Sequence, residues 1–117
     1  MKFKWETPTY RELWEDGGKK MTAYVIAEVR VKDHDAYVEL APVFAASHKE
    51  YGGGIVARSD DPDTFAGMPP GGRIVVIQFP DIGVARRWWN SAEMREARER
   101  RDVYRINSMF AVEGIVT

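Results

Sequence analysis

The order of strand-like and helix-like segments in this 117-residue chain predicts an α+β domain with the element order β–α–β–β–α–β, that of a ferredoxin-like sandwich. The segment 73–79 supports this, because it is rich in β-branched residues and is stopped by Pro80-Asp81, as a central strand would be. Helical periodicity at 33–49 and 81–101, on either side of that strand, is the second observation. Such a fold has a four-stranded antiparallel sheet with its helices on one face.

Length and composition favour one domain. With 44% hydrophobic and 30% charged residues the chain is long enough for one core and too short for two. A net charge of −1 gives no electrostatic reason to expect a nucleic acid or a membrane as partner. There is no cysteine and no long apolar segment, so disulfides and a membrane span are not expected. We therefore expect a cytoplasmic protein with no nucleic-acid and no membrane partner.

Residues 1–20 are predicted to be an N-terminal arm attached to a single domain at 21–117. The arm mixes charged residues with Trp5, Tyr10 and Trp14 and ends in a glycine-containing hinge at 16–20. Large aromatic side chains are costly to leave in water, so one expectation is that the arm packs on its own domain or on a neighbouring subunit. The alternatives are a frayed tail and a natural start at Met21.

Residues 22–31 form the first predicted strand, because alternate positions differ in character. The small apolar set is expected to face the helices: Ala23, Val25, Ala27, Val29 and Val31. A helix should follow, capped by Asp33 or Asp35 and running to about Lys49, with Pro42 bending or breaking it. The glycines after Tyr51 end this helix.

The second half of the chain completes the pattern. Its predicted elements are a strand at 53–58 with a short continuation at 64–67, the strand at 73–79, a helix from Asp81 to Trp89, a helix from a capping box at 90–93 to about Arg101, and a strand from 103 or 104 to Val112. Both alternating sets of the strand 73–79 are largely apolar, so both of its faces should be covered. We expect helices over Val75, Ile77 and Phe79. A second subunit should cover the face of Gln78, whose amide should then be an interface hydrogen-bonding group.

Several short motifs in residues 22–114 resemble one protein family. They are Ala23-Tyr-Val-Ile-Ala27, Tyr51-Gly-Gly53 followed by Arg58, Val75-Val-Ile-Gln-Phe-Pro80, and Trp88-Trp-Asn-Ser-Ala-Glu-Met94. In this order they resemble the domain of unknown function 1330 family of the dimeric α/β-barrel group. The resemblance implies a homodimer in which two sheets face each other. Ala92 and Met94 stand where members often have proline and tyrosine, and residues 1–20 fall outside the pattern.

His48 is the candidate catalytic residue. It lies on the apolar helix face one turn after Phe44, and an imidazole suits acid–base chemistry near neutral pH. The simpler interpretation is a histidine that caps the helix C-terminus, or a satisfied group at the edge of the core. His34, in a charged turn, is expected to be exposed.

Tyr51, Arg58, Trp88 and Trp89 are the candidate ligand-binding residues. Arg58 offers two parallel donors to a substrate carboxylate, although pairing with a nearby aspartate of 60–63 is the simpler outcome. Tyr51 could supply a pocket hydroxyl or belong to the core. Trp88 and Trp89 lie about 100° apart on a helix, so one should be core and the other should line a cavity or an interface.

The remaining chemistry-bearing residues have structural explanations. Ser91 is expected to cap a helix, and two histidines fourteen residues apart do not make a metal site, so neither metal nor cofactor is expected. The first hypothesis is a homodimer binding a small organic, carboxylate-bearing molecule between sheet and helices. The fold resemblance allows a cofactor-free monooxygenase-like or isomerase-like enzyme. The alternative is a non-catalytic ligand-binding or protein-interaction module, and the sequence leaves enzyme activity open.

Overall fold

The computed structural model describes residues 21–115, which form a four-stranded sheet and three helices. The elements are β1 (Ala23–Val31), α2 (His34–Glu50), β2 (Gly54–Ser59), β3 (Arg73–Phe79), α3 (Ile82–Trp89), α4 (Ala92–Arg98) and β4 (Tyr104–Glu113). This confirms the predicted β–α–β–β–α–β order, with the second helical region divided in two. The predicted arm at 1–20 lies outside the described residues.

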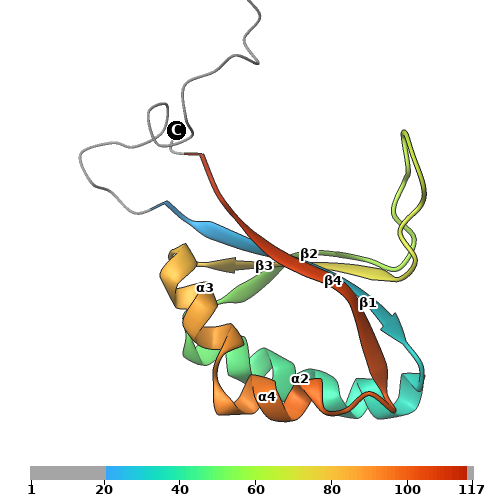
Figure 1. Cartoon of the computed structure of the whole chain (residues 1–117), viewed down its shortest axis with the longest axis horizontal. Coiled ribbons are helices and arrows are strands. Elements are labelled where there is room, and N and C mark those ends of the chain that lie inside the picture. Colours follow the sequence, from blue (N-terminus) through green and yellow to red (C-terminus); the bar gives the residue numbers. More distant parts are fainter. Residues whose placement is uncertain (1–20, 116–117) are drawn as a thin grey trace, which may run out of the picture.

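The sheet is antiparallel throughout, with the strand order β2-β3-β1-β4. The strand 73–79 is therefore central, as predicted, and β2 and β4 are the edges. Figure 1 shows all three helices on one side of the curved sheet. The sheet thus has an inner face, which meets the helices, and an outer face, which the helices leave open.

Small and medium apolar side chains make the inner face of the central strands. Seven of them are at most 8% exposed: Ala23, Val25, Ala27, Val29, Val75, Ile77 and Phe79. Val25 and the three β3 residues pack in one cluster with Ala85 and Trp88 of α3 and with Met94 and Ala97 of α4. Ala27 and Val29 pack in a second cluster with Val103 and Tyr104. The alternation in the sequence therefore predicted the buried face correctly.

Side-chain caps fix where the helices begin. Asp33 accepts a hydrogen bond from the Ala36 amide at 3.1 Å, so of the two predicted caps Asp33 is right and Asp35 lies in the first turn. Asp81 caps α3 in the same way, accepting from the Val84 amide at 2.9 Å. α4 is capped by Ser91, one residue later than the capping box at 90–93 suggested.

Of the bend or break predicted at Pro42, the break does not occur, because α2 runs through this residue. Two other local predictions were wrong. Residues 64–67 belong to an irregular β2–β3 loop, which stands away from the domain (Figure 1), because pairing ends at Ser59 opposite Ile74. α4 stops at Arg98, because the next amides bond to Glu96 and Ala97 carbonyls in a tight turn toward β4.

The outer face has an apolar centre with a polar border. Cross-strand register places these side chains on it: Tyr24, Ile26, Glu28, Ile74, Val76, Gln78, Ser108, Phe110 and Val112. Phe110 and Val112 are 51% and 43% exposed in the single chain, and Gln78 is exposed as well. The predicted cover of this face by a second subunit remains a prediction.

Candidate functional site

A cavity of about 250 Å³ lies between the end of α3 and the edge of the sheet formed by β1 and β4. Its lining is largely apolar: Val25, Ala85, Trp88, Trp89, Met109, Phe110 and Ala111, with Arg86 and Asn90 as the polar members. Helix α3 supplies the lining because its spacing puts Ala85 and Trp88 on the buried side. A hollow with mostly apolar walls and few polar groups is typical of a small-molecule site.

A smaller void of about 70 Å³ lies deeper, between the inner face of the sheet and helices α2 and α4. Its walls include Tyr37 and Phe44 of α2, Met94 of α4 and Ile106 of β4. Trp88 and Met109 line both hollows. These two residues therefore lie between the outer cavity and the inner void.

Trp88 and Trp89 have different environments, as their angular separation predicted. Trp88 is 2% exposed, and its Nε1 donates to Ser47 Oγ at 3.1 Å. The Ser47 hydroxyl donates in turn to the Phe44 carbonyl at 2.7 Å. Trp88 is thus a fixed wall, whereas Trp89 is half-buried and stands at the edge of the cavity.

Arg98 holds Trp89 in place. Its guanidinium carbon lies 4.1 Å from the centre of the Trp89 ring, and its Nη1 donates to the Trp89 carbonyl at 2.7 Å. Sequence reasoning missed this contact, because it joins two helices across a turn of unknown shape.

Tyr104 closes the other end of the inner void. Its hydroxyl donates to the Ala97 carbonyl at 2.6 Å, and its ring meets Phe44 edge to face with centroids 5.5 Å apart. Burial raises the pKa of Tyr104 to about 12, so the phenol stays neutral at physiological pH. Neither hollow has a histidine or a carboxylate among its lining residues, so the arrangement supports binding more directly than acid–base chemistry.

His48 lies at the C-terminal end of α2 and is not among the residues that line these two hollows. It is 6% exposed, its Nδ1 is 3.4 Å from the Gly53 carbonyl, and its Nε2 is buried without a hydrogen-bond partner among the described residues. Tyr51 is its neighbour, since the Tyr51 amide donates to the His48 carbonyl at 3.1 Å and the Tyr51 side chain packs on the core. The catalytic role of His48 stays a prediction.

Arg58 lies on the edge strand β2 and is exposed. Asp60, one of the three aspartates of 60–63 expected as its partner, instead forms a two-bond ion pair with Arg73. The hydrogen bond from Arg73 lowers the pKa of Asp60, and Arg58 contributes a smaller electrostatic effect. Within residues 21–115 no hydrogen bond joins Arg58 to His48 or Tyr51. The structure therefore brings Trp88 and Trp89 together at a cavity and His48 and Tyr51 together at a helix end.

Two residues that shape the cavity were not predicted. Ser47, beside the proposed catalytic His48, orients Trp88, and Met109 lines both hollows. The available signals were a polar residue on the apolar face of α2 and a flexible side chain on the inner face of the last strand. Across residues 21–115 no three His, Asp or Glu side chains gather as a metal site would require, and no helix there could cross a bilayer.

Comparison with known proteins identifies the family. The model of the family described as Domain of unknown function (DUF1330) matches residues 22–115. The chain belongs to this family. No curated protein matches it. Membership agrees with the resemblance carried by the motifs between Ala23 and Met94.

Solved structures share the fold of this DUF1330 chain. The RPA0582 protein of unknown function from Rhodopseudomonas palustris is similar with a TM-score of 0.65 and 12% identity, over 85% of this chain and 86% of that one. The methylated RPA0582 protein is similar with a TM-score of 0.65 and 11% identity, over 84% of this chain and 84% of that one. HapK from Hahella chejuensis is similar with a TM-score of 0.56 and 14% identity, over 81% of this chain and 94% of that one. At such identities these likenesses establish the fold.

Proposed function

We propose that this DUF1330 protein is a homodimeric binding protein for a small organic molecule, which occupies the cavity beside Trp88 and Trp89. One observation carries the proposal: a cavity of about 250 Å³ with mostly apolar walls, close to the lower end of the range for small-molecule sites. A single ring or a short alkyl chain matches this volume. The inner void behind Met109 offers extra room for a longer chain.

The open outer face supports the homodimer. It carries Ile26, Val76, Phe110 and Val112 at its centre, and an apolar surface of this kind is costly to leave in water. A second copy would cover it sheet to sheet, giving a dimeric α/β barrel. Phe110 is both a residue of the outer face and one of the residues that line the cavity, so the proposed interface and the proposed binding site adjoin along β4.

Binding is tested with octan-1-ol as a neutral apolar probe. Titration calorimetry should detect saturable binding to the wild-type protein, and Trp89→Ala should weaken it about tenfold, because a large aromatic wall is lost. Phe65→Ala is the matched control, since Phe65 is 97% exposed on the β2–β3 loop and lines neither hollow. Absence of saturable binding, or equal losses in the two variants, would contradict the proposal.

The homodimer is tested by light scattering at micromolar concentration. Val76 lies at the centre of the outer face, and Val76→Lys should convert dimer to monomer by placing a charge in the interface. Val38→Lys, at a 55% exposed site on α2, is the control and should leave the mass unchanged. A wild-type monomer would refute this part of the proposal.

Catalysis is a second candidate function, and His48 is the residue that favours it. A buried Nε2 without a partner is unusual, because such a group loses its hydrogen bonds to water on folding. A cofactor-free reaction could use it as acid or base if a substrate reached it. A thermal-shift screen of metabolites on wild type and His48→Ala tests this, and stabilisation that the substitution leaves unchanged would rule out a direct role.

A further inference from the structure

A second hollow, of about 500 Å³, lies along β4 next to Trp89. Four cationic residues, Lys32, Arg98, Arg101 and Arg105, are among those that line it, together with Trp89 and Tyr104. We call it the basic groove. No carboxylate is among its lining residues, although the chain as a whole has a net charge of only −1. The positive charge is therefore a local feature.

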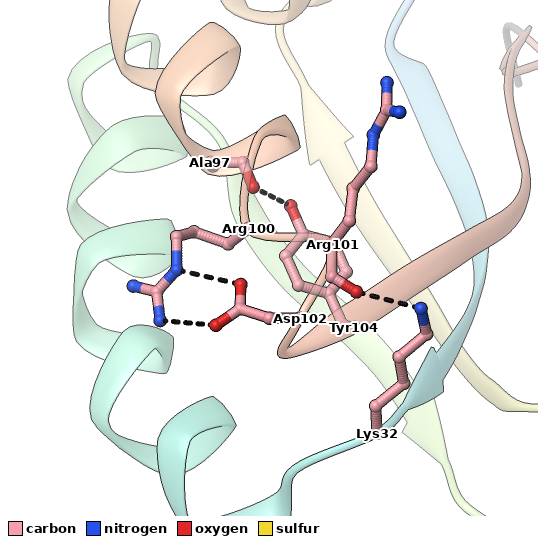
Figure 2. A network of polar contacts seen from close by, with 6 residues as sticks. All are labelled: Lys32, Ala97, Arg100, Arg101, Asp102 and Tyr104. Carbon is pink, nitrogen blue, oxygen red and sulfur yellow. Dashed lines mark hydrogen bonds and ion pairs between the residues drawn. The ribbon is translucent and has the colours of Figure 1, made fainter.

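Neighbouring contacts leave this charge available. Figure 2 shows an ion pair between Asp102 and Arg100, in which Arg100 Nε lies 3.3 Å from Asp102 Oδ1. The Arg101 side chain points away from that pair. Lys32 Nζ donates to the Arg101 carbonyl at 2.8 Å, which leaves its other protons and its charge free to act. The nearest acidic residue in the sequence is thus already paired outside the groove.

Repulsion between like charges near the basic groove lowers the stability of the fold. Arg105 on β4 stands directly opposite Arg30 on β1, and like charges in a cross-strand pair are destabilising. The cation of Arg98, by contrast, is held by the ring and carbonyl of Trp89. A bound anion would relieve the repulsion, and it would meet at least one donor that is already fixed in position.

We propose that the basic groove binds the phosphate or carboxylate group of the same ligand whose apolar part occupies the cavity. This inference rests on the proposed binding function. Trp89 lines both hollows, so a ligand can pass along its ring from one to the other. On β4 the groove lies at 104–106 and the cavity at 109–111. The middle residues of these two stretches, 105 and 110, are five positions apart, so at about 3.3 Å per residue the ligand is an elongated amphiphile roughly 16 Å long with one anionic end.

The experiment compares three probes with the same chain: octyl phosphate, octanoate and octan-1-ol. Calorimetry on the wild-type protein should give affinities for the two anions at least about tenfold higher than for the alcohol. Raising the salt to about 0.5 M should weaken only the anions, because their binding is electrostatic. The ratio of octyl phosphate to octanoate then distinguishes a phosphate site from a carboxylate site.

Substitutions connect the effect to the basic groove. Arg101→Gln combined with Arg105→Gln should lower the affinity for octyl phosphate about 10- to 100-fold and leave octan-1-ol binding unchanged. Arg100→Gln is the control, because Arg100 is paired with Asp102 and does not line the groove. All three positions are exposed, so the variants should fold, which their thermal melts will verify.

Each outcome separates the two proposals. If each of the three probes binds with the same affinity to the wild-type protein and to the double variant, the basic groove is refuted as an anion site. The proposal for the cavity is then unaffected. If inorganic phosphate binds as tightly as octyl phosphate, and octan-1-ol does not bind, the groove is supported and the cavity refuted. A single-stranded oligonucleotide that binds more tightly than octyl phosphate, and in competition with it, would overturn the small-molecule assignment.

Discussion

The C-terminal end of α2 and the end of the fold at the β4 edge use their polar residues in different ways. At the C-terminal end of α2, His48, Tyr51 and Gly53 close on one another through backbone contacts and leave no described cavity among them. At the β4 edge, Trp88 and Trp89 border an apolar cavity, and a cationic groove adjoins it. The C-terminal end of α2 contains residue types that often take part in catalysis. The β4 edge instead has an open hollow and cationic residues without carboxylate partners in its lining, which are the properties that a site for an anionic ligand needs.

The largest expected effect is that of removing Trp88. Trp88→Ala should lower the free energy of unfolding by about 3–5 kcal/mol, because a buried ring is lost and a cavity remains. Trp88→Phe keeps a ring but leaves Ser47 without its donor, and should cost about 1–2 kcal/mol. Chemical denaturation measures both. A loss below about 1 kcal/mol for the alanine variant would mean that the β4 end is not built on Trp88.

The fold was predictable because its signals are local. Alternation in 22–31 identified the buried side of β1, and Asp33 and Asp81 marked the helix starts through their own side chains. The strand at 73–79 was recognised from its β-branched composition. Errors occurred where the chain had to choose between two local possibilities, as at residues 64–67 and at the end of α4.

The candidate site was less predictable, because its contacts join residues far apart in the sequence. Ser47 meets Trp88 across 41 positions, and Met109 reaches the cavity only through the pairing of β4 with β1. Trp88 and Trp89 were found because large aromatic residues stand out in any sequence. The basic groove was missed, because the acidic residues between the arginines of α4 balance them in sequence but do not line the groove.

A smaller effect of opposite sign is expected at the other end. His48→Leu should raise the free energy of unfolding by about 1 kcal/mol, because the substitution removes a buried nitrogen that has no partner. Denaturant titration measures it, and His48→Gln, which keeps a polar group there, is the comparison. A loss of more than about 2 kcal/mol for the leucine variant would show that the contact of His48 Nδ1 with the Gly53 carbonyl outweighs the unpaired Nε2, and would weaken the contrast between the two ends.

The pH dependence of stability should report on Tyr104. The folded-state pKa is about 12 against an ordinary value of 10.0, so between these values the folded protein keeps a proton that the unfolded chain has lost. The contribution of the Tyr104 proton to the free energy of unfolding is complete below about pH 10 and is lost as the pH rises toward 12. Thermal melts across that interval should show the loss in wild type, and Tyr104→Phe should lack it. Identical curves would mean that the phenol is accessible to solvent.

The smallest effect is expected at Arg58. Arg58→Gln should change the free energy of unfolding by less than about 0.5 kcal/mol, because this exposed side chain has no described hydrogen bond. It should also leave the affinity for octyl phosphate unchanged. If instead the substitution weakens binding as strongly as the double substitution at Arg101 and Arg105, the sequence-based assignment was right and the ligand reaches β2.

An NMR titration of amide and indole signals with octyl phosphate tests the central claim most directly, because it shows which end of the molecule meets the ligand. We predict that the signals that move most belong to Trp88, Trp89 and residues 98–111, with the Trp89 indole among the largest changes. Signals of residues 48–58 should stay in place. Movement concentrated at His48, Tyr51 and Arg58, with the β4 edge unchanged, would contradict the account.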